Sequence, residues 1–263
     1  ARIKKKKKTV KIAIVGKYFG TGDFTLSDSY LSVIEAIKFS SYKLGVEPEI
    51  HWLSSHEFEN KRKLEKLKKY QGIIVPGGFG ETGIAGKLAV VQYAREKKIP
   101  YFGLCYGMQL MVIEYARNVL NIKDAQTIEI DPKGKNPVID IMPDQKKKLA
   151  KNEYGGTMRL GSFPAYLKRG TLARKLYGKE IVEERHRHRY EVNPEYINEL
   201  SSVDLVFSGV SPDKRLMEIA ELPQMKHPFF LGTQFHPEFQ ARPLDPHPLF
   251  TGFIKAVMKR RVK

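Results

Sequence analysis

The stretch YFGLCYGMQL at residues 101–110 reads as a buried strand that runs directly into a helix, with Cys105 at the corner between them. Gly103 lies two residues before this cysteine and Gly107 two residues after it. Small residues at these places let the backbone turn sharply and let a substrate approach, as at a nucleophile elbow. A sulfur at a helix N-terminus is favoured as thiolate by the helix dipole and the free amide groups. The alternative is that Cys105 is a small buried core residue.

The segments around this corner alternate between apolar strands and helices. Strands are predicted at 10–16, 48–53, 72–76 and 99–104, and helices after the capping residues Ser27 and Asp28 and at about 58–70, 83–97 and 106–118. Beyond residue 120, short alternating stretches read as antiparallel strands without intervening helices, followed by a terminal helix at about 248–261. We therefore expect an α/β fold, in which a mostly parallel central sheet is flanked by helices and carries additional antiparallel strands.

The composition is typical of one globular domain. The chain has 263 residues, of which 41% are hydrophobic and 29% charged, enough for one substantial core. We assign residues 1–9 to a Lys-rich tail and residues 10–263 to the domain. The single cysteine, the absence of signal-peptide features and the absence of an apolar run of bilayer length predict a cytoplasmic protein with no membrane association.

The net charge of +17 could indicate nucleic acid or an anionic membrane as a partner. Much of this charge lies in short runs, at residues 4–8, 146–148 and 258–263. Such runs are typical of solvated tails and faces. Nucleic acid is therefore not the expected partner, and a catalytically silent, basic regulatory or nucleic-acid-binding module is kept as an alternative.

A second motif, FHPEF at residues 235–239, follows the apolar segment FFLGTQF. In an extended segment alternate side chains share a face, so His236 and Glu238 could act together, with Pro237 stiffening the link. This spacing suits a general base and the carboxylate that orients it. His236 would take the thiol proton of Cys105 and later give it to the leaving group, while Glu238 would hold the imidazole tautomer. A surface loop is the alternative.

A third motif, PGGFG at residues 76–80, is another strand end followed by glycines. Ligands of α/β sheets bind beyond the carboxyl ends of the strands, so this loop should lie beside Cys105. The N–H groups of Gly78 and Tyr106 would then form an oxyanion hole for tetrahedral intermediates. A flexible turn is the other interpretation of the Gly-Gly pair.

In this order, PGG, GxCxG with a following Gln, and HPE resemble the triad-type, class I glutamine amidotransferases. Within them the chain is similar to the glutaminase domain of the CTP synthase family, through GKY at 16–18, SDSYLSVIEAI at 27–37, GGTMRLG at 155–161 and EERHRHRYEVNP at 183–194. The resemblance implies that Cys105, His236 and Glu238 form a triad. It also implies hydrolysis of glutamine to glutamate and ammonia through a γ-glutamyl thioester.

The resemblance further implies which residues hold glutamine. They are Gly78, Tyr106, Gly107, Met108, Gln109, Glu129 and Arg189. Arg189 can pair with the α-carboxylate, whereas Glu129 and the side-chain oxygen of Gln109 can accept from the ammonium group. Without the resemblance, RHRHR at 185–189 would read as a basic strand for phosphate or nucleic acid. Because the family usually has Leu where this chain has Tyr106, the ring could narrow the pocket and raise KM for glutamine.

No metal or cofactor is expected in this domain. In the CTP synthase family the ammonia passes to a preceding amidoligase domain that uses ATP, UTP and Mg²⁺, and the full-length enzyme is expected to be a homotetramer. The expected partners are therefore L-glutamine and that amidoligase domain, with the GGTMRLG loop and its Arg159 as the candidate coupling surface. The alternatives are another triad amidotransferase or a γ-glutamyl hydrolase, which need the same three catalytic residues.

Overall fold

The computed structural model describes residues 8–16, 30–141 and 158–262. Four features of the sequence lie outside these ranges. They are the Lys-rich run up to residue 7, the predicted helix caps Ser27 and Asp28, the lysines at 146–148, and the first three residues of GGTMRLG.

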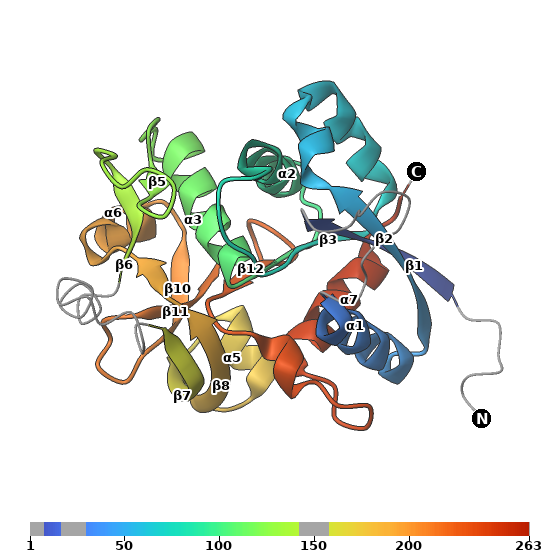
Figure 1. Cartoon of the computed structure of the whole chain (residues 1–263). Coiled ribbons are helices and arrows are strands. Elements are labelled where there is room, and N and C mark those ends of the chain that lie inside the picture. Colours follow the sequence, from blue (N-terminus) through green and yellow to red (C-terminus); the bar gives the residue numbers. More distant parts are fainter. Residues whose placement is uncertain (1–7, 17–29, 142–157, 263) are drawn as a thin grey trace.

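A nine-stranded sheet forms the centre of the described part of the chain (Figure 1). In sheet order its strands are β2 (Val46–Ser54), β1 (Lys8–Gly16), β3 (Gly72–Val75), β4 (Tyr101–Leu104), β12 (Phe230–Thr233), β11 (Met217–Glu221), β10 (Val206–Val210), β7 (Arg159–Leu167) and β8 (Ile181–His188). The strands from β2 to β12 pair in parallel, and the pairs from β12 to β8 are antiparallel. This arrangement confirms the predicted α/β fold.

Helices cover both faces of this sheet. In Figure 1, α2 (Ile84–Glu96) and α3 (Tyr106–Asn118) lie on one face, and α1 (Leu31–Lys43), α5 (Leu172–Tyr177) and α7 (Pro248–Lys259) lie on the other. Alternate residues of a strand point to opposite faces. In β1, Ala13 and Val15 therefore join the apolar cluster under α2 and α3, whereas Ile12 and Ile14 join the cluster under α1 and α7. The continuous apolar run of β1 reflects burial on both faces.

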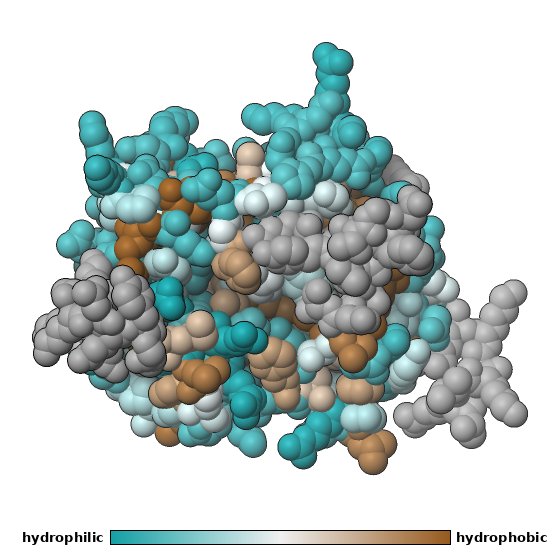
Figure 2. All heavy atoms as spheres, viewed as in Figure 1, coloured by the Kyte–Doolittle hydropathy of each residue, from teal (hydrophilic) through white to brown (hydrophobic). Residues whose placement is uncertain are grey.

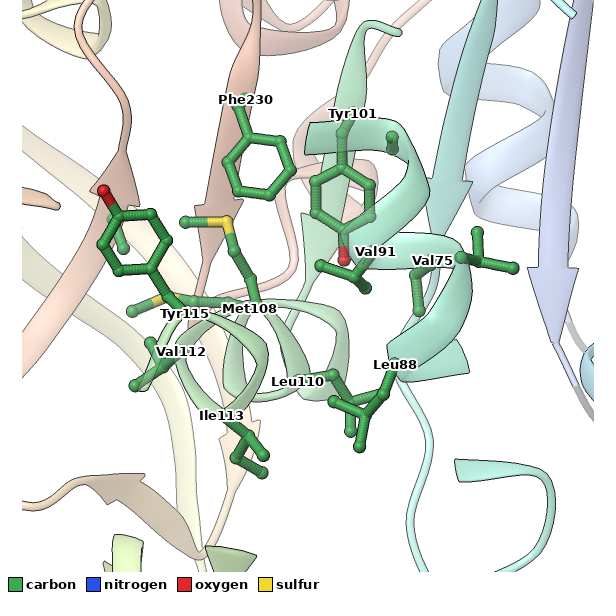
Figure 3. Packing of buried hydrophobic residues seen from close by; sticks show 14 of the residues in the cluster. Val75, Leu88, Val91, Tyr101, Met108, Leu110, Val112, Ile113, Tyr115 and Phe230 are labelled. Atoms are coloured by element: carbon green, nitrogen blue, oxygen red, sulfur yellow. The ribbon is translucent and has the colours of Figure 1, made fainter. Parts of the chain in front are cut away.

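The start of α3 packs closely against the sheet (Figure 3). Met108 lies beside Phe230, whose ring centroid is 4.9 Å from that of Tyr101. The Tyr101 hydroxyl donates to the carbonyl of Gly107 at 2.9 Å. A Cβ on Gly107 would lie 2.1 Å from the carbonyl oxygen of Val75. Since no Cβ fits there, the glycine lets α3 pack directly on the backbone of β3.

Three predicted elements differ from the observed ones. The segment of β12, expected among the antiparallel strands, does pair antiparallel with β11, but on its other edge it pairs in parallel with β4. The region after residue 120 contains α5 and α6 (Ile197–Ser202), so it is not free of helices. The Lys-rich helix expected at 58–70 is instead two 3₁₀ helices, η3 (Ser55–Glu59) and η4 (Lys61–Lys69).

Long-range contacts explain the short helix that the sequence pattern missed. Six residues are too few for a helical repeat to stand out. Helix α5 forms because the Glu221 carboxylate of β11 accepts from the backbone N–H groups of Leu172 and Ala173, and Thr171 caps the same end. Glu221 lies 49 residues after Leu172 in the sequence, so no local pattern reveals this contact.

A smaller sheet of β5 (Gln126–Thr127), β6 (Pro137–Ile141) and β9 (Tyr190–Val192), with the 3₁₀ turn η5 (Pro194–Tyr196) after it, flanks α3. The lysines of η4 face solvent, and Figure 2 shows hydrophilic groups over the upper part of the molecule, where Figure 1 draws this segment. The lysines of η4 thus form a solvated face.

In the ranges that the structure describes, no helix has both the length and the apolar character that a bilayer crossing requires. The cytoplasmic location stays a prediction. The division into a tail at 1–9 and a domain at 10–263 also stays a prediction, and β1 begins at Lys8, two residues before the strand expected at 10–16.

Candidate functional site

Cys105 lies in the sharp turn between β4 and α3. Its backbone has φ 49° and ψ −100°, a conformation rare for residues other than glycine that costs roughly 1–3 kcal/mol. The Cys105 N–H donates to the carbonyl of Thr233 at 2.6 Å, and its carbonyl accepts from the N–H groups of Met108 and Gln109. Neighbouring strand and helix therefore hold this strained residue from both sides. The structure contains the predicted strand–cysteine–helix corner.

His236 and Glu238 lie beside this turn. Their side chains are joined by a hydrogen bond of 2.8 Å between His236 Nδ1 and Glu238 Oε1, and both are buried. The sequence pattern predicts an extended segment here, but the chain instead turns into the 3₁₀ helix η6 (Pro237–Gln240). Pro237 favours this turn because its fixed φ suits the first position of a helix. The pair predicted from alternation in a strand is thus formed by a helical turn.

Gly77 lies beside both His236 and Cys105. A Cβ at this position would lie 2.9 Å from His236 Cε1 and 3.8 Å from Cys105 Cβ. A larger residue would push the histidine away from the cysteine, so the PGGFG loop is part of the catalytic geometry. This loop, the elbow and η6 are brought together from three distant parts of the sequence.

The charges around His236 favour its protonated form. Burial by itself lowers the pKa of His236, but the charges of Glu238 and Cys105, and hydrogen bonds to both, raise it well above its ordinary value. An imidazolium next to the sulfur stabilises a thiolate. The arrangement therefore suits a cysteine nucleophile with an adjacent acid–base group.

These residues open into one cavity of about 770 Å³. Seven of the predicted site residues line it: Gly78, Cys105, Gln109, Glu129, Arg189, His236 and Glu238. Four exposed apolar side chains also line it, and they belong to segments far apart in sequence: Leu31, Phe79, Met158 and Phe239. The cavity has a polar interior and an apolar rim.

Opposite charges meet in this cavity. Arg189 has a buried Nε for which the described residues provide no hydrogen-bond acceptor, and Glu129 accepts from the N–H of Gly80 at 3.0 Å. Gln109 Nε2 donates to the carbonyl of Tyr190 and to Gln234 Oε1. With its nitrogen engaged, the Gln109 oxygen is the atom that can accept from a ligand. The cavity thus places the cation of Arg189 together with the acceptors of Glu129 and Gln109, as an amino acid requires.

Tyr106, Gly107 and Met108 do not line the cavity, although all three were predicted to hold glutamine. Gly107 packs on Val75, and the Met108 side chain points into the core (Figure 3). The Tyr106 ring is buried under the PGGFG loop, where its hydroxyl donates to the carbonyl of Gly80 at 3.1 Å. These residues can contact a ligand only through backbone groups, and the Tyr106 ring does not narrow the cavity.

Sequence reasoning missed Gln234, whose Nε2 donates to Cys105 Sγ at 3.6 Å. It also missed His188, which lines the cavity and whose pKa is lowered to about 3 by burial and by the nearby charges of Arg159 and His236. No distinctive sequence pattern marks Gln234, which follows β12 and precedes the HPE motif, or His188, the last residue of β8. Only the fold brings Gln234 to the Cys105 sulfur and His188 to the cavity wall.

Arg159 is turned into the domain instead of toward a partner. Its guanidinium lies 2.7 Å from Glu218 Oε1 and 3.5 Å from Glu191 Oε1, and the side chain is 9% exposed. His186 and His188 are hydrogen-bonded to each other beside the same two carboxylates. The suggestion that Arg159 forms a coupling surface is therefore wrong for its side chain, which balances buried acids.

In the described part of the chain, no group of three or more His, Cys, Asp and Glu side chains is arranged to hold a metal ion. Independence from metals and cofactors stays a prediction.

Comparison with known proteins agrees with this geometry. The family model for class I glutamine amidotransferases matches residues 25–256. The CTP synthases of Thermococcus gammatolerans and Caldanaerobacter subterraneus are each 51% identical to this chain, over 97% and 96% of it, respectively. These matches cover 46% and 45% of the two relatives, so the chain spans about half the length of the curated relatives it matches.

Two solved structures have the same fold as this chain. The glutaminase domain of Trypanosoma brucei CTPS with bound acivicin superposes with a TM-score of 0.86 and 37% identity, covering 96% of this chain and 95% of that one. A GMP synthase subunit from Thermoplasma acidophilum, at 15% identity and a TM-score of 0.56, shares the fold alone and covers 95% and 94% of the two chains. The chain therefore belongs to the class I glutamine amidotransferase family, among the glutaminase domains of CTP synthases.

Proposed function

We propose that this chain hydrolyses the side-chain amide of L-glutamine with Cys105 as nucleophile, His236 as acid and base, and Glu238 as the group that orients the histidine. The observation that carries the proposal is the convergence of these three side chains in one cavity that also presents Arg189 and Glu129. A reacting amide and the two charged ends of an amino acid can then be bound at once. The family to which the chain belongs supports the same reaction.

The reaction begins with attack of the Cys105 thiolate on the amide carbon of glutamine. The oxygen becomes an oxyanion, which the N–H groups of Gly78 and Tyr106 would stabilise. The His236 imidazolium gives its proton to the amide nitrogen, the C–N bond breaks, and ammonia leaves behind a γ-glutamyl thioester. Water then attacks the thioester while His236 takes its proton, and glutamate is released. Glu238 keeps the imidazole aligned and offsets its charge.

Glutamine would be oriented at its α-carbon end. Arg189 would pair with the carboxylate in a forked geometry, and Glu129 with the Gln109 oxygen would accept from the ammonium group. Gly107 and Met108 would contribute only backbone groups to this site, since Gly107 has no side chain and the Met108 side chain is buried in the core. The chemistry uses protein groups alone, with no metal or cofactor in this domain.

We also propose that the ammonia serves an amidoligase domain, which would use ATP and Mg²⁺ to convert UTP to CTP in a homotetrameric enzyme. The chain accounts for about half of its curated relatives, which are named CTP synthases. The exposed apolar rim of the cavity, which includes Phe79 and Phe239, supports docking of a second domain at the pocket mouth. Another triad amidotransferase or a γ-glutamyl hydrolase would need the same triad and differ in the acceptor.

Incubation with 6-diazo-5-oxo-norleucine, a reactive glutamine analogue, should add its mass to the wild-type chain and not to the Cys105→Ser variant. The label should attach to Cys105 because the chain has no other cysteine. Intact-mass spectrometry measures the adduct, and circular dichroism verifies that both proteins are folded. A folded wild type that takes no label, even with an added ligase half, would contradict glutaminase chemistry and favour a silent basic module.

Glu238→Gln should reduce glutamine turnover by roughly 10²–10⁴-fold, as loss of effective acid–base catalysis does. It removes a charge that raises the pKa of His236, so the imidazolium that stabilises the thiolate becomes less populated at neutral pH. The pH profile of Cys105 alkylation by iodoacetamide should therefore shift to higher pH. Glu199→Gln, at an exposed carboxylate, is the control. An unshifted profile would remove Glu238 from the triad.

Arg189→Lys should raise KM for glutamine about tenfold while kcat changes little, because lysine keeps the charge but loses the forked pair with a carboxylate. Steady-state glutaminase assays measure both constants. Arg185→Lys, at an exposed arginine of β8, is the matched control. If kcat fell and KM stayed constant, Arg189 would not be the carboxylate ligand.

Full-length protein that contains the amidoligase half should form CTP from UTP with glutamine or with ammonium chloride as the nitrogen source. Its Cys105→Ser variant should lose only the glutamine-dependent activity, because external ammonia bypasses the glutaminase. CTP formation followed by chromatography measures both. Amination of XMP in place of UTP would overturn this assignment and leave glutamine hydrolysis standing.

A further inference from the structure

The side chain of Tyr106 makes contacts that the proposed reaction does not use. Its backbone N–H is a candidate oxyanion donor, but its ring runs in the other direction, under the PGGFG loop. Burial, followed by the nearby charges of Glu129 and Glu81, raises the pKa of the Tyr106 hydroxyl, so it stays protonated. It therefore donates steadily to the carbonyl of Gly80, at 3.1 Å.

Gly80 is held from a second side. Its N–H donates to Glu129 Oε1 at 3.0 Å, while its carbonyl accepts from Tyr106. The two hydrogen bonds fix the consecutive peptide groups that flank the Gly80 Cα, which has φ +74°. Glycine adopts this left-handed conformation without strain but does not enforce it. The two side chains therefore set the course of the loop at this point.

The ring also faces the loop two residues earlier, at Gly78. A Cβ built on Gly78 would lie 3.9 Å from Tyr106 Cδ1 and 3.9 Å from Lys87 Nζ. The same Nζ lies 5.2 Å from the centroid of the Tyr106 ring, and both side chains are buried. Tyr106 and Lys87 therefore lie on the side of Gly78 toward which a Cβ would point, with room for that one atom between.

We propose that the Tyr106 side chain is a positioning residue for the proposed glutaminase reaction: it tethers the PGGFG loop at Gly80, so that the Gly78 N–H two residues earlier stays aimed at the oxyanion formed above Cys105. One residue then supplies one oxyanion donor through its backbone and holds the other through its side chain. The inference rests on the proposed function.

A Tyr106 ring that narrowed the pocket and a Tyr106 side chain that tethers the loop would change different kinetic constants. A ring that narrowed the pocket would raise KM, and its removal would improve glutamine binding. A tether acts on the tetrahedral intermediate instead, because oxyanion donors stabilise charge that develops only during the reaction. Its removal should lower kcat and leave KM nearly constant.

The test compares Tyr106→Phe, which deletes only the hydroxyl, with Tyr115→Phe. Tyr115 lies on the same helix, is also buried and donates to a backbone carbonyl, that of Val203, but it does not line the cavity. We expect Tyr106→Phe to lower kcat about tenfold, less than the 10²–10³ lost with a whole oxyanion donor. Glutamine KM should stay within about twofold, and Tyr115→Phe should behave like the wild type.

Two further measurements isolate the loop. Hydrogen exchange followed by mass spectrometry should show faster exchange of the amides at 78–81 in Tyr106→Phe and not in Tyr115→Phe. Alkylation of Cys105 by iodoacetamide, which passes through no oxyanion, should keep its wild-type rate.

An unchanged kcat in Tyr106→Phe, with an active wild type, would overturn the tether. Equal losses of turnover and alkylation would also overturn it, because they would indicate a general collapse of the site. If the wild type neither turned over glutamine nor took the diazo label, the proposed function would fail, and hydrogen exchange alone would then decide whether Tyr106 holds the loop.

Discussion

The approach of the α3 backbone to the backbone of β3 is the constraint on which the site depends. Gly107 lies so close to the Val75 carbonyl that a Cβ would lie 2.1 Å from it. This contact, with the Tyr101 hydroxyl bound to the Gly107 carbonyl, fixes where α3 begins. Cys105 must then turn through φ 49° to join strand and helix. The strain at the nucleophile follows from the packing of the helix that comes after it.

Charge at the site is divided between two neighbouring groups of residues. On the cavity side, Glu238 and the sulfur keep His236 protonated in spite of its burial. Behind it, burial and the charge of Arg159 lower the pKa values of His186 and His188, while burial raises the pKa values of Glu191 and Glu218. Neutral histidines next to an imidazolium avoid adding like charge in a medium of low dielectric. The network thus leaves His236 as the cation among these histidines.

The loops at the ends of β3 and β4 connect binding to catalysis. Glu129 accepts from Gly80 in the PGGFG loop and also lines the part of the cavity proposed for the substrate ammonium. Tyr106 joins the same loop to the elbow. A ligand that interacts with Glu129 therefore acts on a group that also holds the PGGFG loop. In the proposed reaction, recognition of the amino acid end is thereby linked to the arrangement of the amide donors.

The sequence by itself determined the strand–Cys105–helix corner, the alternation that builds the parallel half of the sheet, and the chemical pairing of His236 with Glu238. Those features are local, because they follow from glycine, proline and the apolar period over a few residues. Only the tertiary structure decided that β12 runs parallel to β4, that Arg159 faces inward, that Gln234 contacts the Cys105 sulfur and that His188 lines the cavity. These outcomes depend on contacts between segments far apart in the chain, for which a single sequence carries no periodic pattern. The direction of the Tyr106 side chain also could not be predicted from the sequence, because it is set by the contact with the PGGFG loop.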